Sequence, residues 1–225
     1  MTWRIQTASG ERGFERQRGC DPMFNRTTQI ILKASVSLAF CLVCRPVLAQ
    51  HYVEVRGAST EYRFFDWNYT FSNSIVLDAF YVGVPGSNEF NLGGGYVLKP
   101  SPSLTIAPLV YAVIGKEGGQ RGIKVAVLVA LDKEGWRLNA FLGQYARLSG
   151  ETGNYQVLDA LDFSRVICRR WEIGVSSGFF HADGAWNPQV GPLIKFNDRL
   201  GSWSVSYRFG PQNEFRAGRT FLLKK

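Results

Sequence analysis

The most constraining feature of this sequence is a two-residue alternation that recurs from Gln50 onward. It is clearest in residues 202–209, where large apolar residues hold the odd positions and small or polar residues the even positions. A period of two places successive side chains on opposite faces of a β-strand. The apolar face of this stretch holds Trp203, Val205, Tyr207 and Phe209, and the polar face holds Ser202, Ser204, Ser206 and Arg208.

Similar segments follow one another after Gln50, separated by turns rich in Gly, Pro, Asn and Asp, and no ten-residue stretch there has a helical period. We expect strands within residues 51–67, 75–81, 90–98, 104–114, 123–132, 136–143, 155–167, 171–179, 190–196, 202–209 and 215–222. Residues 51–67 are interrupted at Gly57, so they form either one bulged strand or two short strands. Residues 155–167 are less regular, because Asp159 and Asp162 fall on opposite faces of a regular strand.

The polar face of these segments collects charged residues. They are Lys124, Arg137, Glu172, Lys195 and Arg208. A soluble barrel packs large apolar residues inside, whereas a transmembrane barrel turns them outward and keeps a polar interior. We therefore expect an all-β protein, an antiparallel up-and-down transmembrane β-barrel of about ten strands within a range of 8–12.

Aromatic residues near the ends of the expected strands fit the girdles of a membrane interface. They are Trp67, Trp136, Tyr155, Trp171, Trp186 and Trp203. The alternative is ordinary core filling, because aromatic residues are common in strands.

The N-terminal segment has the composition of an export signal. Residues 1–22 are polar and charged, and Met23 begins a different composition, so residues 1–22 are read as a mis-assigned upstream start. Arg26 and Lys33 then precede an apolar run of 11 residues, 34–44. A positive segment followed by a short apolar run is typical of a secretory signal peptide.

The apolar run ends before a small-residue cleavage site at Ala49. A membrane-spanning helix needs about 20 apolar residues, which is more than this run supplies. We therefore expect residues 23–49 to be a signal peptide and residues 50–225 to be the barrel domain, exported to the cell outer membrane.

Cysteines and charge exclude several classes of function. Cys41 and Cys44 have the spacing of a redox or metal motif, but both lie inside the apolar run of the expected signal peptide. Cys168 is the one cysteine after that run, so we expect no internal disulfide in the mature chain. The whole chain has a formal charge of +8, but the part after residue 49 has a smaller positive excess, with 19 Lys and Arg against 15 Asp and Glu. Because the body contains no basic run interleaved with aromatic residues, we expect no nucleic-acid partner.

Neither a nucleotide nor a metal is expected as a cofactor. Residues 91–96, Asn-Leu-Gly-Gly-Gly-Tyr, are rich in glycine, but a phosphate-binding loop opens a helix and no helix follows them. His51 and His181 are the histidines of the chain, and Asp183 is the one carboxylate at ligand spacing from either of them. A catalytic metal site needs more ligands than these.

The pattern of export signal, alternating strands and an aromatic-bearing final segment resembles the broad class of small Gram-negative outer-membrane β-barrels. The final segment is residues 215–222, Phe-Arg-Ala-Gly-Arg-Thr-Phe-Leu, after which the chain continues to Lys225. Members of this class typically end on an aromatic residue that the barrel-assembly machinery reads. The resemblance implies insertion in the outer membrane, with outer-membrane lipid and the assembly machinery as partners.

His181 and Asp183 are the residues of this sequence that could be interpreted as catalytic. His181 followed by Asp183 near a strand end loosely resembles the active-site region of outer-membrane lipid A 3-O-deacylases, where the residue two after the histidine is a serine nucleophile. Asp183 stands in that place, so a general base at His181 would need a hydroxyl from elsewhere, such as Ser176 or Ser177. A solvated loop pair is the alternative, and we expect no hydrolase activity.

These observations favour a non-enzymatic outer-membrane barrel with a structural, adhesive or narrow-passage role. A barrel of about ten strands leaves a lumen that side chains largely fill. The alternatives are a soluble lipocalin-like ligand binder in the periplasm and a lipid-modifying outer-membrane enzyme.

Overall fold

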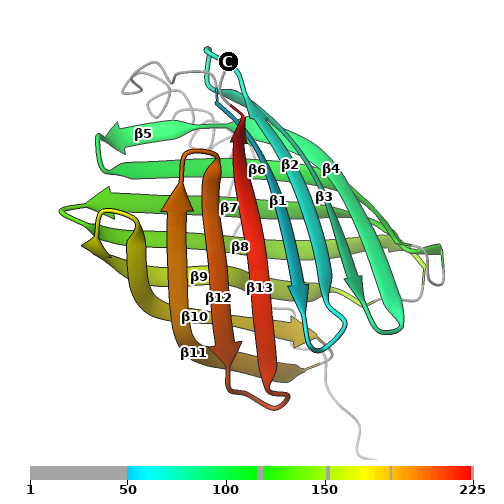
Figure 1. The fold of residues 1–225 in the computed structure, drawn as a ribbon. Coiled ribbons are helices and arrows are strands. Elements are labelled where there is room, and N and C mark those ends of the chain that lie inside the picture. The colour runs from blue at the N-terminus through cyan, green and yellow to red at the C-terminus, as the bar shows by residue number, and fades with distance from the viewer. Residues whose placement is uncertain (1–49, 116–118, 151–152, 183, 224–225) are drawn as a thin grey trace, which may run out of the picture. The chain divides into compact units, whose positions relative to one another are not determined.

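The computed structural model describes residues 50–115, 119–150, 153–182 and 184–223, and within them the chain is built of strands (Figure 1). The predicted upstream start and signal peptide, residues 1–49, lie outside the described residues. No helix in the described part of the chain is long and apolar enough to span a membrane. The strands are β1 (Gln50–Ala58), β2 (Arg63–Thr70), β3 (Ile75–Val84), β4 (Ser87–Tyr96), β5 (Leu98–Ser101), β6 (Leu104–Gly115), β7 (Arg121–Lys133), β8 (Trp136–Ser149), β9 (Tyr155–Cys168), β10 (Trp171–Ala182), β11 (Ala185–Asp198), β12 (Gly201–Arg208) and β13 (Glu214–Leu223).

The strands form a closed antiparallel barrel. From β1 to β4 and from β5 to β13 each strand pairs with the next one in the chain, β1 pairs with β13, and β4 pairs with β6 (Figure 1). β5 is a short strand that pairs with β6 beside this closure. Among the described residues, 12 strands therefore make the wall. The predicted up-and-down barrel is confirmed, and the strand number lies at the upper limit of the expected range of 8–12.

The first alternating stretch accounts for one of the additional strands. Residues 51–67 belong to two strands, β1 and β2, rather than to one bulged strand. The chain reverses at Glu61, whose φ is 63°, and the Ala58 amide donates to the Tyr62 carbonyl oxygen at 2.9 Å. A left-handed residue and a hydrogen bond across the reversal are features of a tight turn, so the interruption at Gly57 leads into a hairpin.

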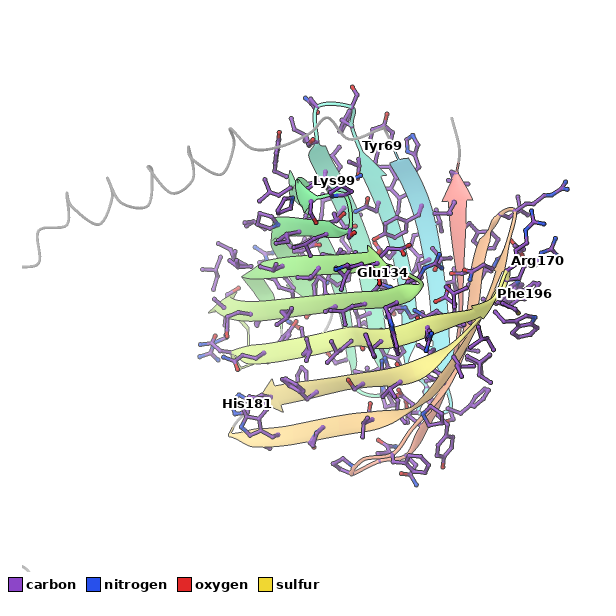
Figure 2. All side chains as sticks on the ribbon, turned by 90° about the vertical axis from the view of Figure 1, so that its left-hand side faces the viewer. Tyr69, Lys99, Glu134, Arg170, His181 and Phe196 are labelled. Atoms are coloured by element: carbon purple, nitrogen blue, oxygen red, sulfur yellow. The ribbon has the colours of Figure 1, made fainter. Side chains whose placement is uncertain are left out.

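The connections between strands alternate between the two ends of the barrel. We call the end where β1 begins and β13 finishes the terminal end, and the opposite end the loop end. Tight turns at Glu134 and Arg170 lie at the terminal end, whereas His181 lies at the loop end (Figure 2).

The outer face of the wall is apolar, as the alternation predicts. Val125 is 54% exposed and Val205 42% exposed, whereas Lys124 is 3% exposed and Arg208 2% exposed. Large apolar side chains exposed on the outer face include Val55, Phe65, Leu77, Leu92, Val110, Ile173, Ile194, Trp203, Tyr207 and Phe209. Polar side chains buried on the inner face include Asp66, Asn68, Asp78, Glu89, Asn91, Glu172, Ser176 and Glu214. This arrangement is that of a transmembrane barrel and the opposite of a soluble ligand-binding barrel.

A bulge explains the irregular alternation in β9. Pairing with β8 steps from Asn139↔Asp162 to Phe141↔Asp159, so two residues of β8 oppose three of β9. One extra residue in a strand reverses which positions face inward. The interpretation that Asp159 and Asp162 lie on opposite faces is therefore wrong, because both carboxylates line the lumen.

The bulge also means that one predicted girdle residue, Tyr155, faces the lumen instead of the membrane. Tyr155 is 8% exposed and lies inside the barrel, on the same face as Asp159. Trp67 lies in the middle of β2 rather than near its end. The other predicted girdle residues, Trp136, Trp171, Trp186 and Trp203, are exposed on the outer face near strand ends.

The glycine run of residues 91–96 belongs to β4, not to a phosphate loop. A Cβ atom on Gly93 would meet the Val110 carbonyl oxygen at 2.1 Å, and one on Gly95 the Pro108 carbonyl oxygen at 1.9 Å. These glycines therefore allow the close approach of β4 and β6 that closes the barrel.

Candidate functional site: the charged lumen

The barrel encloses a cavity of about 1310 Å³. Thr60 and Gln212 line it at the loop end, and Lys99 and Ser202 line it at the terminal end. One cavity therefore extends along the barrel, and its lining charges are the candidate functional site.

Three arginines from separate strands converge on one carboxylate. Arg56 of β1, Arg208 of β12 and Arg216 of β13 contact Asp159 of β9 at 3.4, 3.2 and 2.9 Å. β13, β12, β11 and β10 separate β1 from β9 along one side of the wall. The contact between Arg56 and Asp159 therefore crosses the lumen, and we call these four residues the arginine cluster.

Neighbouring side chains fix the geometry of the arginine cluster. Glu54 accepts from Nε of Arg56 at 2.7 Å and from its Nη2 at 2.8 Å, a two-pronged arrangement that holds the guanidinium plane. Glu214 accepts from Nε of Arg216, which lies two residues further along β13. Ser176 accepts from Arg208 at 2.8 and 3.0 Å. Guanidinium groups held by partners on the wall are preorganised to bind anionic groups.

A second polar group lies around Glu89 near the loop end. Lys124 of β7 and Tyr155 of β9 both contact its carboxylate. Asn91 donates to the same carboxylate at 2.8 Å, and Gln120 at 3.3 Å. These contacts join β4, β7 and β9 inside the lumen and compensate the buried charge of Lys124.

Apolar side chains fill another part of the lumen. The ring of Phe80 lies 5.9 Å from that of Phe64, 5.0 Å from that of Tyr111 and 5.9 Å from that of Phe141. These rings come from β2, β3, β6 and β8 and pack in offset or edge-on orientations. The cavity is therefore narrower than the space that the same wall would enclose if it were lined by small residues.

The structure does not bring His181 together with either serine considered as its partner. His181 stacks on Trp186 of the outer face, with ring centroids 4.1 Å apart. Ser176 is buried in the lumen and donates to Asp162 at 2.7 Å, and Ser177 donates to the Leu161 carbonyl oxygen. His181 and Ser176 are separated by an odd number of positions along β10, so they point to opposite faces of the wall. Asp183 lies outside the described residues.

We expect His181→Ala to leave both folding and lipid composition unchanged. The substitution removes one ring stacked on an exposed tryptophan, a contact worth about 0.5–1.5 kcal/mol at most. The measurement is the yield of folded barrel together with the acyl-chain content of the surrounding lipid. Release of acyl chains by the wild type that is lost in the variant would show that the catalytic interpretation was right.

The arginine cluster was not singled out by the sequence. Arg56 and Arg216 alternate with apolar neighbours, so their inward direction follows from period two. Their meeting with Asp159 depends on strand register, closure of the barrel and the bulge in β9, none of which the alternation specifies. Among the described residues, no group of three or more His, Cys, Asp or Glu side chains is arranged to hold a metal ion.

No protein-family model and no curated protein matches this sequence. Solved structures with the same fold include the KdgM porin, with a TM-score of 0.58 and 12% identity over 77% of this chain and 99% of that chain. The KdgM porin in complex with disordered oligogalacturonate gives 0.58 and 11% over 78% and 99%. A NanC porin structure gives 0.54 and 10% over 77% and 100%. At these identities the likeness concerns the fold.

Proposed function

We propose that this chain is a narrow outer-membrane channel that passes small polar solutes. The observation that carries the proposal is the single cavity lined by residues from both ends of the barrel. A cavity that reaches both ends favours passage over a purely structural or adhesive role. The outward position of large apolar side chains favours a membrane barrel over a lipocalin-like binder.

The arginine cluster sets the charge preference in this proposal. A solute crossing the lumen meets the guanidinium groups of Arg56, Arg208 and Arg216, which share Asp159 and are flanked by Glu54 and Glu214. Guanidinium groups match carboxylate, sulfate and phosphate oxygens in two-pronged pairs. We therefore propose that small anionic solutes, including acidic sugars such as the oligogalacturonate solved with the KdgM porin, pass in preference to cations.

Location and partners follow from the same proposal. The apolar outer face would contact outer-membrane lipid, and the final strand β13 would be read by the barrel-assembly machinery. Delivery would depend on cleavage of the predicted signal peptide before Gln50.

A liposome-swelling assay tests passage. We expect vesicles containing the folded barrel to swell in a small polyol and to swell more slowly as the solute becomes larger, because side chains narrow the lumen. Folding is checked by the difference in gel migration before and after boiling. Vesicles that hold folded barrel and do not swell even in the smallest polyol would overturn the proposal.

A further inference from the structure

An apolar groove lies on the outer face of the barrel, close to its terminal end. Its volume is about 310 Å³, and it spans three neighbouring strands, β10, β11 and β12. The residues that line it are Trp171, Ile194, Phe196, Trp203 and Val205. All five side chains are apolar, so the groove suits a hydrocarbon chain and offers no partner to a polar group.

The packing of the aromatic rings explains why the wall is hollow here. Phe196 of β11 pairs with Trp171 on one side and with Trp203 on the other. The rings of Phe196 and Trp171 lie 4.8 Å apart. The guanidinium group of Arg219 on β13 lies over the ring of Trp203, 4.7 Å from its centroid. Phe196 therefore packs toward β10 and Trp203 toward β13, and the space between them is the groove.

Exposed arginines lie just beyond these rings, at the terminal end. Arg169 and Arg170 form the turn between β9 and β10, and Arg199 lies in the turn between β11 and β12. The Asn197 amide donates to the Arg170 carbonyl oxygen at 2.7 Å, so the two turns are adjacent. Figure 2 shows Arg170 and Phe196 at the same end of the barrel.

The positive charge of these turns is not compensated locally. Among the residues that the structure describes, no carboxylate forms an ion pair with Arg169, Arg170 or Arg199. Asp198 is the acidic residue of the two turns, and it already pairs with Arg219 at 2.9 Å. An excess of positive charge therefore lies at one end of an apolar groove, at the edge of the membrane-facing wall.

We infer that the groove and the exposed arginines together bind one anionic phospholipid, with an acyl chain in the groove and the phosphate group at the arginines. Guanidinium groups match phosphate oxygens in two-pronged pairs, and basic residues at a membrane surface attract anionic headgroups. An acyl chain gains little by exchanging lipid for an apolar protein wall. The arginines therefore set the selectivity, and the groove sets the position.

Charge complementarity favours this occupant over a zwitterionic lipid, which has no net negative charge to neutralise the arginines. It also favours an anionic lipid over a second copy of the chain, which would bring the same positive turns to the same place. The inference does not depend on whether the barrel conducts.

Native mass spectrometry of the detergent-folded barrel tests the headgroup preference. We expect the wild type to retain one phosphatidylglycerol molecule more tightly than a phosphatidylcholine molecule with the same acyl chains. Arg170→Gln combined with Arg199→Gln should weaken phosphatidylglycerol binding by about 25-fold, which is about fivefold for each arginine. The control is Arg121→Gln combined with Arg147→Gln, which removes two exposed arginines from the loop end and should keep the wild-type affinity.

Val205→Phe tests the groove, because the larger apolar side chain fills it without placing a charge in the membrane. We expect this variant to lose the retained phosphatidylglycerol. Val125→Phe makes the same change on the outer face of β7, where Val125 is 54% exposed, and should keep the lipid. Gel migration before and after boiling checks that each variant is folded.

Three results would overturn the inference. One is equal affinity of the wild type for the two lipids. Another is unchanged phosphatidylglycerol binding in the double variant of Arg170 and Arg199 or in Val205→Phe. The third is a dimer that phosphatidylglycerol does not displace, because a second copy of the chain would then cover the groove.

Discussion

Asp159→Asn should destabilise the barrel by about 3 kcal/mol, at the lower end of the range for removing one partner of a buried ion pair. The substitution takes the shared carboxylate away from all three arginines of the cluster. In the variant, Arg56 still pairs with Glu54, and Arg216 still pairs with Glu214. Arg208 is 2% exposed and loses its carboxylate partner, so only the hydrogen bonds to the Ser176 hydroxyl remain. The free energy of unfolding in urea, measured in lipid vesicles, gives the size of the effect.

Asp132→Asn is the matched control for this prediction. Asp132 pairs with Arg137 at 3.2 Å, but its side chain is 64% exposed, and exposed pairs contribute about 0–1 kcal/mol. Combining Asp159→Asn with Arg208→Gln should cost less than the sum of the two single changes, because the second change removes the unpaired charge. Additive effects would show that the two side chains are not energetically coupled.

Val205→Arg should impair folding into bilayers, at a cost of about 2–4 kcal/mol for a charge at mid-depth on the outer face of a barrel. Val205 lies in the middle of β12, is 42% exposed and pairs with Ile194 and Ala217 on the neighbouring strands. Its side chain therefore points away from the lumen. The measurement is the yield of folded barrel after dilution from urea into vesicles.

Ser204→Arg is the control, because it places the same charge one residue away on the opposite face. Ser204 pairs with Lys195 and Gly218, and a lumen position keeps an arginine in contact with water. We expect a much smaller loss of folding yield than for Val205→Arg. Equal losses in the two variants would contradict the assignment of the faces.

The barrel and its two faces could be predicted because both follow from a local rule. A period of two can be recognised from neighbouring residues alone. Val205 and Arg208 are therefore assigned to opposite faces without knowledge of any partner strand. The prediction failed where the local rule fails. A single extra residue between Asp159 and Asp162 brings both to the lumen, and it also turns Tyr155 inward.

The candidate sites were less predictable because they depend on register. Arg56 and Asp159 are 103 positions apart in sequence, and their contact exists because the barrel closes and brings separate strands across one lumen. Phe196 and Trp203 are closer in sequence, but the groove between them requires the pairing of these two residues across β11 and β12. The sequence alone indicates which side chains face the lumen. Which of these side chains contact one another depends on which strands the barrel brings together.

Single-channel recording in planar bilayers tests the proposed channel most directly. We expect the folded wild type to give discrete, small current steps with a reversal potential that favours anions. The double variant Arg56→Gln with Arg216→Gln should conduct more and shift its selectivity toward cations. This shift follows because the variant widens the lumen and leaves Glu54, Asp159 and Glu214 with fewer cationic partners. A folded wild type without current steps, or a double variant with unchanged conductance and selectivity, would contradict a lumen controlled by the arginine cluster.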